Sequence, residues 1–305
     1  MAYALMALAA VAWATSGTFT VLATDNGATV MQVAVFGGAL SAMILIPAIA
    51  VFDPRSLRIA RKDIVPFLVF SLLTGTFFSL AWYYAIDLTS VTTAVILLYM
   101  YPSIVTVASV FVLGERLTKG KAVALPLTFI GCVLVAEAYD LDQLRLNMAG
   151  ILLGLYAAFS AALYYLWGKK FLARYSANTI VLYMTGFSVP FLVLIANPVE
   201  LVRTSLPSFA WLNILMIAII PTTIGFVVSM VALNHIEASK ASIVASIEPV
   251  AAAAIAYVVL SEHIAAVQAA GVVLVFVGVL LLRLASEEPD GEAAEAPRPP
   301  AIETR

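Results

Sequence analysis

Charged residues are scarce in this chain of 305 residues. Only 11% are Asp, Glu, Lys or Arg and 63% are hydrophobic, whereas roughly a quarter of an ordinary soluble domain is charged. The 16 basic and 18 acidic residues give a net charge of −2, so no basic surface for nucleic acid is expected. The composition excludes a soluble globular domain and a nucleic-acid-binding protein.

Cysteine and histidine are scarcer still. Cys132 is the one cysteine and lies in an apolar run, while His235 and His263 both fall near expected loops. This excludes a disulfide framework, a CxxC motif and a metal cluster. Intramembrane enzymes need paired carboxylates, histidine clusters or a Ser and His dyad. We therefore expect no enzymatic activity, no metal and no cofactor.

Apolar runs long enough for a membrane helix, about 20 residues, recur along almost the whole sequence. The charged and turn-forming breaks between them are short and leave no room for a soluble catalytic domain. The sequence predicts an all-α, polytopic membrane protein whose ten transmembrane helices lie at about 2–23, 30–52, 64–86, 89–113, 121–138, 148–169, 177–196, 209–233, 239–260 and 265–284. Residues 285–305 are acidic and proline-rich, which predicts a disordered cytoplasmic tail.

Lysine and arginine are distributed unevenly over the expected loops. One side of the membrane collects 14 of the 16, and only Arg145 and Arg203 fall on the other side. Positively charged loops stay in the cytoplasm. This predicts an even number of spans in the cell's inner (plasma) membrane, with both termini in the cytoplasm.

The two halves of the sequence resemble each other. An ungapped shift of 147 residues aligns Pro102 with Pro249, Glu115 with Glu262, and Gly131 with Gly278. We therefore expect repeats of five helices each, at 1–146 and 147–284. Because five is odd, the second repeat enters the membrane the opposite way up. Inverted repeats allow a site between the halves to face either side in turn.

A motif recurs around these aligned residues. It consists of Tyr101-Pro102 or Glu248-Pro249, then Gly114-Glu115-Arg116-Leu117 or Ser261-Glu262-His263-Ile264, then Gly131 or Gly278. Over essentially all of residues 1–284 the chain resembles the EamA family of the drug/metabolite transporter superfamily, and within it the YddG-type bacterial amino-acid exporters. Ser261 stands where the family usually has glycine. The resemblance implies export of aromatic and other neutral amino acids.

Aromatic and hydroxyl residues within the spans are candidates for substrate binding. A neutral amino acid needs apolar walls and a few polar groups for its ammonium and carboxylate. The candidates are Trp13, Ser16, Phe78, Ser79, Trp82, Tyr83, Tyr99, Tyr101, Tyr164 and Trp167. Of these, Phe78, Ser79 and Trp82 share one helix face. Tryptophan and tyrosine also gather in interfacial belts, and this second interpretation applies to Trp167.

Carboxylates and prolines at special positions form a second group of candidates. Glu248 is the only acidic residue deep in a span, where it serves as a protonation switch or substrate contact, or else in helix packing. Pro102 and Pro249 are predicted to kink their helices and are candidate hinges. Glu115 and Glu262 lie at interfacial turns, where we expect a structural role in bonding backbone amides.

Together these features predict a secondary transporter that exports small neutral amino acids, aromatic and other hydrophobic ones among them, and related metabolites by alternating access. Its expected partners are the solute and the lipid bilayer, and we expect a monomer, with a dimer as the alternative. The alternative function is exchange of a phosphorylated or nucleotide-linked solute. That substrate calls for Lys or Arg at mid-membrane, and the 16 basic residues lie outside the centres of the expected spans.

Overall fold

A computed structural model describes residues 1–136, 147–197, 201, 205–259 and 265–287, and all regular structure in those residues is helical. The first half of the chain contains α1 (Ala2–Thr24), α2 (Val30–Phe52), the short η1 (Pro54–Leu57) and η2 (Arg61–Asp63), α3 (Ile64–Ser71), the π-helical η3 (Leu72–Thr76), α4 (Phe77–Leu88), α5 (Val91–Leu98), α6 (Tyr101–Val112) and α7 (Lys119–Val135).

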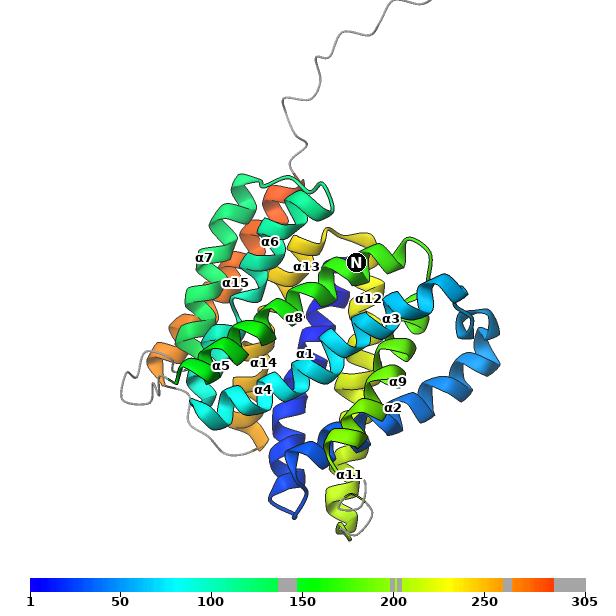
Figure 1. The fold of residues 1–305 in the computed structure, drawn as a ribbon. Coiled ribbons are helices and arrows are strands. Elements are labelled where there is room, and N and C mark those ends of the chain that lie inside the picture. The colour runs from blue at the N-terminus through cyan, green and yellow to red at the C-terminus, as the bar shows by residue number, and fades with distance from the viewer. Residues whose placement is uncertain (137–146, 198–200, 202–204, 260–264, 288–305) are drawn as a thin grey trace, which may run out of the picture.

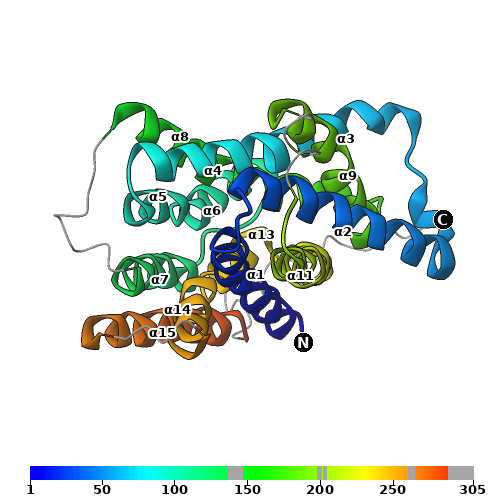
Figure 2. The same cartoon turned by 90° about the horizontal axis from the view of Figure 1, so that it is seen from below.

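The second half has the same order of elements. It contains α8 (Met148–Leu172), α9 (Ala177–Ile195), α11 (Ser208–Ile217), the π-helical η5 (Ala218–Gly225), α12 (Phe226–His235), α13 (Ala238–Ala245), α14 (Glu248–Val259) and α15 (Ala266–Glu287). Figures 1 and 2 show these helices packed as one bundle.

The helices are long and apolar enough for a multi-pass membrane protein. Within the described ranges, nine helical segments reach the length and hydropathy of a membrane span. The tenth is α7, which has 17 residues and lies along α15 in both views (Figures 1 and 2). The predicted all-α fold is confirmed. One detail was wrong, because α15 runs to Glu287 and the predicted tail therefore begins as helix; residues 288–305 lie outside the described part.

The fourth helix of each half is broken, and the breaks are equivalent. Adding 147 to the bounds of α5 and α6 gives those of α13 and α14. The predicted fourth helices, 89–113 and 239–260, are present as single spans, Thr93–Val112 and Ala238–Val259, and each has two turn residues in its middle. Pro102 and Pro249 follow these turn residues, and each is the second residue of the helical segment that comes next. In that first turn the missing N–H of proline leaves no hydrogen bond unmade.

The fifth helices, α7 and α15, pack antiparallel at close range. Gly120 lies beside Ala285 at one end of the pair, and Gln268 Nε2 donates to the carbonyl of Val135 at the other, 3.2 Å away. Between them a Cβ on Gly131 would lie 2.8 Å from the carbonyl oxygen of Gly271. Small residues permit such an approach. Since equivalent helices run in opposite directions, the two halves are inverted.

The third helix of each half contains a π segment at an equivalent position, η3 and η5. A π turn frees backbone carbonyls from the normal i→i+4 ladder, and such segments are frequent at functional sites. In η3 the carbonyl of Leu73 accepts hydrogen bonds from Ser160 Oγ at 2.6 Å and Tyr156 Oη at 3.2 Å. Side chains of α8 thus stabilise the π turn of the other half.

Candidate functional site

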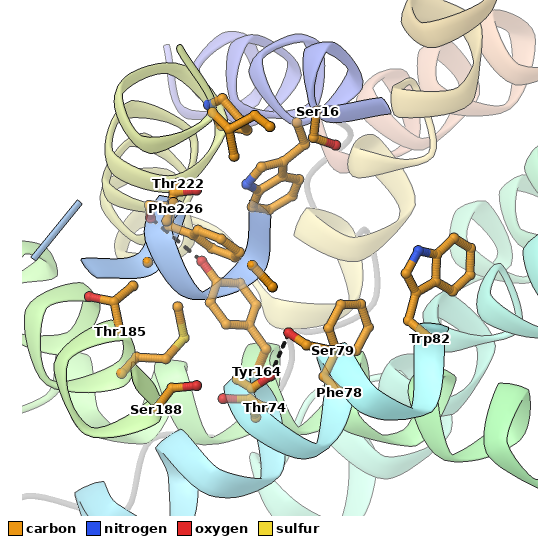
Figure 3. A pocket seen from close by; sticks show the side chains of 18 of the residues that line it. Ser16, Thr74, Phe78, Ser79, Trp82, Tyr164, Thr185, Ser188, Thr222 and Phe226 are labelled. Carbon is orange, nitrogen blue, oxygen red and sulfur yellow. Dashed lines mark hydrogen bonds between the residues drawn. The ribbon is translucent and has the colours of Figure 1, made fainter. Parts of the chain in front are cut away.

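A cavity of about 460 Å³ lies between the two halves. Its walls come from α1, α2, η3, α4, α8, α9, α11, η5 and α12, and from the residues beside both helix breaks, Leu98, Tyr101 and Glu248. Figure 3 shows its side chains converging from these helices. The volume falls in the range of about 300–1,000 Å³ that is usual for small-molecule sites.

Aromatic rings form much of the cavity wall. The Trp13 ring lies 5.4 Å from Phe226 and 6.2 Å from Tyr164, and Tyr164 Oη lies 2.5 Å from Ser229 Oγ. Trp13 fits here because Gly225 has no side chain: a Cβ at that position would lie 2.9 Å from Trp13 Nε1. This glycine of η5 therefore sets the position of the indole.

Hydroxyl groups lie around the rings, and sequence analysis missed most of them. The lining includes Thr74, Thr185, Ser188 and Thr222, which come from η3, α9 and η5 (Figure 3). Thr185 Oγ1 donates to the Val181 carbonyl at 2.8 Å. Serine and threonine commonly bond within their own helix in this way, so an apolar sequence gives no signal that distinguishes a lining hydroxyl from a packed one.

The structure brings together eight of the ten predicted substrate-binding residues, namely Trp13, Ser16, Phe78, Ser79, Trp82, Tyr83, Tyr101 and Tyr164. Tyr99 and Trp167 do not line the cavity. Tyr99 is buried in the core with its ring 6.1 Å from that of Tyr101, and residues two apart on a helix point to different faces. Trp167 packs on Phe70 at 6.2 Å. Tyr165 and Phe226, which sequence analysis did not select, do line it.

Charge is almost absent from the cavity. Of the described lining residues, Glu248 is the only one with a formal charge, and none is Lys or Arg. Glu248 begins α14 as Tyr101 begins α6, so the two candidate hinge prolines directly follow two lining residues. The carboxylate thus lies where the two broken helices meet the cavity.

The loops that contain or adjoin the basic residues meet at one end of the bundle, here called the basic end (53–63, 113–118, 173–176 and 236–237). There Glu115 accepts hydrogen bonds from the amides of Ala238 at 2.6 Å and Ser239 at 3.2 Å, and from Ser239 Oγ. Glu115 therefore caps α13 of the other half, not the helix that follows it. Its predicted counterpart, Glu262, lies outside the described residues.

A buried lysine reinforces this contact. Lys121 is 1% exposed, and its Nζ lies 3.4 Å from Glu115 and 2.9 Å from Glu237. Burial alone would raise the pKa of Glu237, but the hydrogen bonds and charges of Lys121 and then Lys240 outweigh it and lower that pKa. The two halves are thus joined by a network of charged hydrogen bonds.

A second contact closes the basic end between α3 and α8. Arg174 donates to both oxygens of Asp63 at 3.2 Å, and Tyr175 Oη donates to Asp63 at 2.6 Å. Burial, and then this hydrogen bond, raise the pKa of Tyr175. Below the ion pair, the rings of Phe67 and Phe171 stack at 4.2 Å. This part of the bundle is filled with side chains.

The opposite end has different residues at the equivalent positions. An offset of 147 residues places Ala210 where Asp63 stands and Gly27 where Arg174 stands, so that end lacks the Asp63–Arg174 ion pair. The cavity reaches in this direction, because it is lined by the first turns of α2 from Val30 to Gly37 and by the later turns of α1 as far as Thr20. The structure is closed at the basic end and hollowed toward the other.

A cavity between inverted five-helix repeats is an arrangement found in many transporter folds. The EamA-like transporter family matches residues 1–136 and 148–284. The chain belongs to this family. An "Uncharacterized transporter" of Archaeoglobus fulgidus is 28% identical over 77% of this chain and 81% of its own length. The "Uncharacterized inner membrane transporter YicL" of Salmonella typhimurium is 26% identical over 74% and 75%.

Two further matches bear on substrate and fold. A "Probable amino-acid metabolite efflux pump" of Salmonella typhimurium is 28% identical over 56% of this chain and 60% of its own length. A solved crystal structure superposes with a TM-score of 0.78 at 18% identity, covering 93% of this chain and 96% of that one. At this identity the superposition establishes the shared fold alone. This EamA protein is a multi-pass membrane transporter.

Proposed function

We propose that this transporter exports small neutral amino acids, aromatic and other hydrophobic ones among them, and related metabolites. One observation carries the proposal: a cavity between the inverted halves has aromatic walls, many hydroxyl groups and one carboxylate. Aromatic faces suit an apolar side chain, and hydroxyl groups suit the ends of a zwitterion. The similarity to an amino-acid metabolite efflux pump agrees with this choice.

Transport proceeds by alternating access. In the described state the basic end is closed by the Glu115 and Asp63 contacts, and the cavity extends toward the other end. By the positive-inside rule, the basic end is cytoplasmic, both termini are cytoplasmic, and the protein lies in the inner (plasma) membrane. Release of the contacts at the basic end, with closure of the opposite end, turns the cavity toward the cytoplasm. The breaks before Tyr101 and Glu248 are the hinges, and the working unit is a monomer.

Exchange of a phosphorylated solute fits the cavity less well. Phosphate groups are bound by Arg or Lys side chains, and the described lining contains neither. A dianion beside Glu248 would also meet a like charge in a low-dielectric site.

Counterflow into proteoliposomes tests the proposal. Vesicles holding purified protein are loaded with unlabelled phenylalanine, and uptake of labelled phenylalanine, leucine or a sugar phosphate is followed, with and without a pH gradient. Saturable uptake of the amino acids and none of the sugar phosphate is expected. Vesicles loaded with unlabelled sugar phosphate serve for the second test. Uptake of labelled sugar phosphate into these vesicles, without uptake of the amino acids in the first test, would overturn the proposal. If the pH gradient changes the rate of amino-acid uptake, transport is coupled to protons, and Glu248 is the candidate proton carrier.

A further inference from the structure

Glu248 has no charged partner among the described residues. No hydrogen bond or ion pair joins its carboxylate to another described residue, although it is close enough to the phenols of Tyr101 and Tyr165 for an electrostatic interaction. The carboxylate lies at mid-membrane and faces the cavity. An ionised carboxylate in such a place is costly unless a cation or proton accompanies it.

Tyr165 is a second polar group that a ligand in the cavity can contact. The residue is 2% exposed and lines the cavity, and its Oη interacts with the Tyr101 phenol but forms no hydrogen bond of good geometry with a described residue. The ring is held in place because it stacks on Tyr101 with 5.7 Å between centroids and an interplanar angle of 6°. Buried hydroxyl groups in proteins nearly always have a partner. A ligand that reaches Tyr165 in the cavity would supply a hydrogen-bond partner.

The cavity therefore offers different binding partners to the ammonium and the carboxylate of a zwitterionic ligand. An ammonium group meets the Glu248 carboxyl group, which is the one acidic group in the described lining, and the oxygen of Tyr165. A carboxylate meets no positive charge in the described lining; its best donor is Trp13 Nε1, which is buried and has no partner in the part of the chain that the structure describes. An indole N–H carries no formal charge, so it cannot form the ion pair with the solute's carboxylate that Lys or Arg would form.

Space for an apolar body lies next to the ammonium position. Phe78, Trp82, Tyr164 and Phe226 form part of the cavity wall (Figure 3). A flat or branched hydrocarbon group fits this space. The cavity therefore provides for a positively charged amine with an apolar body, and a carboxylate adds little.

We propose that Glu248 binds the ammonium group of the solute with Tyr165 as the second contact, and that the solute's carboxylate is dispensable, so that apolar monoamine cations are a further substrate class. The proposal rests on the proposed function in that it assigns one end of the same transported solute. It adds a ligand chemistry that amino-acid transport alone does not require.

Competition in proteoliposomes separates the two ends. Counterflow of labelled phenylalanine is inhibited with phenethylamine, which lacks the carboxylate, or with 3-phenylpropionate, which lacks the amine. For the unmodified protein, phenethylamine should inhibit at a concentration no higher than unlabelled phenylalanine does, and 3-phenylpropionate at least tenfold more weakly. Equal inhibition by the acid and the amine would overturn the proposal without any variant.

Two variants assign the residues. Glu248→Gln keeps the size of the side chain and should weaken inhibition by phenethylamine at least tenfold, while Tyr165→Phe should weaken it several-fold at an unchanged melting temperature. Asp87→Asn removes an exposed carboxylate outside the cavity and should change nothing. Inhibition by phenethylamine that survives in Glu248→Gln would contradict the assignment.

A binding measurement distinguishes this failure from failure of the proposed function. Phenethylamine should raise the melting temperature of the unmodified protein in detergent, and should not raise that of Glu248→Gln. If phenylalanine is not transported but this shift is seen, the amine site stands and the amino-acid proposal fails. If phenylalanine is transported and no shift is seen, the amine site fails alone.

Discussion

Tyr101 and Glu248 occupy the same position in the two halves of the chain. Each is the first residue after a helix break, each is followed by proline, and each lines the cavity. The backbone of the two halves is thus closely similar at this position, while the side chains that it presents to the cavity differ. One half contributes a phenol and the other a carboxylate, and this difference gives a symmetric scaffold a directed binding site.

Gly131→Ala should destabilise the protein. A Cβ at this position would lie 2.8 Å from the carbonyl oxygen of Gly271 and 2.9 Å from the backbone nitrogen of Val275, so α7 and α15 must move apart. Overpacking of this kind costs about 1–3 kcal/mol. A thermal melt in detergent should show a clear fall in melting temperature.

Gly17→Ala is the matched control. No described heavy atom lies within 4 Å of a Cβ at Gly17, and alanine favours helix by up to about 1 kcal/mol. The melting temperature should stay the same or rise. Equal losses in the two variants would mean that the glycine contact between α7 and α15 is not the cause.

Trp82→Ala should weaken transport and leave the fold intact. Trp82 forms part of the cavity wall, and loss of an aromatic contact to the solute costs about 1–2 kcal/mol, which corresponds to a rise of about 5- to 30-fold in KM. Initial rates of amino-acid uptake measure the effect. A melting temperature near that of the unmodified protein is expected alongside.

Tyr99→Ala should give the reverse result. Tyr99 is 7% exposed, belongs to the core and does not line the cavity, and truncation of a buried aromatic side chain costs about 3–5 kcal/mol. The melting temperature should fall steeply, and KM of the surviving protein should change little. If Tyr99→Ala raised KM without a loss of stability, Tyr99 would have to reach the solute in another state.

The fold was predictable because the bilayer restricts it. A span needs about 20 apolar residues with all backbone groups paired within it, so apolar runs between charged loops predict the helices, and an odd number per repeat predicts inversion. The breaks at Tyr99 and Ser246 were signalled by the prolines that follow, yet a kink and a break have the same signature. The π segments were not predictable, because hydrogen bonds from another helix, such as Ser160 to Leu73, stabilise them.

The site was predictable only in part. Helical spacing placed Phe78, Ser79 and Trp82 on one face, and all three line the cavity. The same reasoning fails at a helix break. Tyr99 and Tyr101 are only two positions apart, yet Tyr101 lines the cavity and Tyr99 lies in the core. Thr185 and Ser188 were missed because hydroxyl groups in apolar helices are common and their direction depends on packing.

Glu115→Ala should loosen the closed basic end. The carboxylate accepts from the amides of Ala238 and Ser239, and loss of a capping acceptor costs about 0.5–2 kcal/mol. Hydrogen exchange at these two amides should accelerate by about 2- to 30-fold, the factor that this energy corresponds to. Mass spectrometry of the peptide that spans the start of α13 provides the measurement.

Glu237→Ala is the comparison for that experiment. It removes the other carboxylate that lies beside Lys121, but no hydrogen bond joins its side chain to the described α13 amides. Exchange at Ala238 and Ser239 should therefore be slower than in Glu115→Ala. Equal acceleration in both would show that neutralising Lys121, and not capping α13, holds the two halves together.

Acid should weaken the same end through Glu237. Its pKa is lowered in the folded protein because Lys121 and Lys240, at 2.9 and 3.2 Å, outweigh its burial. A group with a lowered folded pKa stabilises fully above its unfolded pKa, about 4.3, and loses that contribution as the pH falls through the folded value. The Glu237 contribution should thus be constant from pH 7 to about 5 and decline in more acidic solution.

Thermal melts of Glu237→Gln across this range isolate the effect from that of the other carboxylates. The variant should melt below the unmodified protein at pH 7, and the gap should narrow in acid, because protonation removes the same charge that the substitution removes. Asp25→Asn, at an exposed position after α1, should run parallel to the unmodified protein throughout. A gap for Glu237→Gln that stayed constant down to the most acidic pH would mean that the side chain acts by packing and that its charge contributes nothing to closure of the basic end.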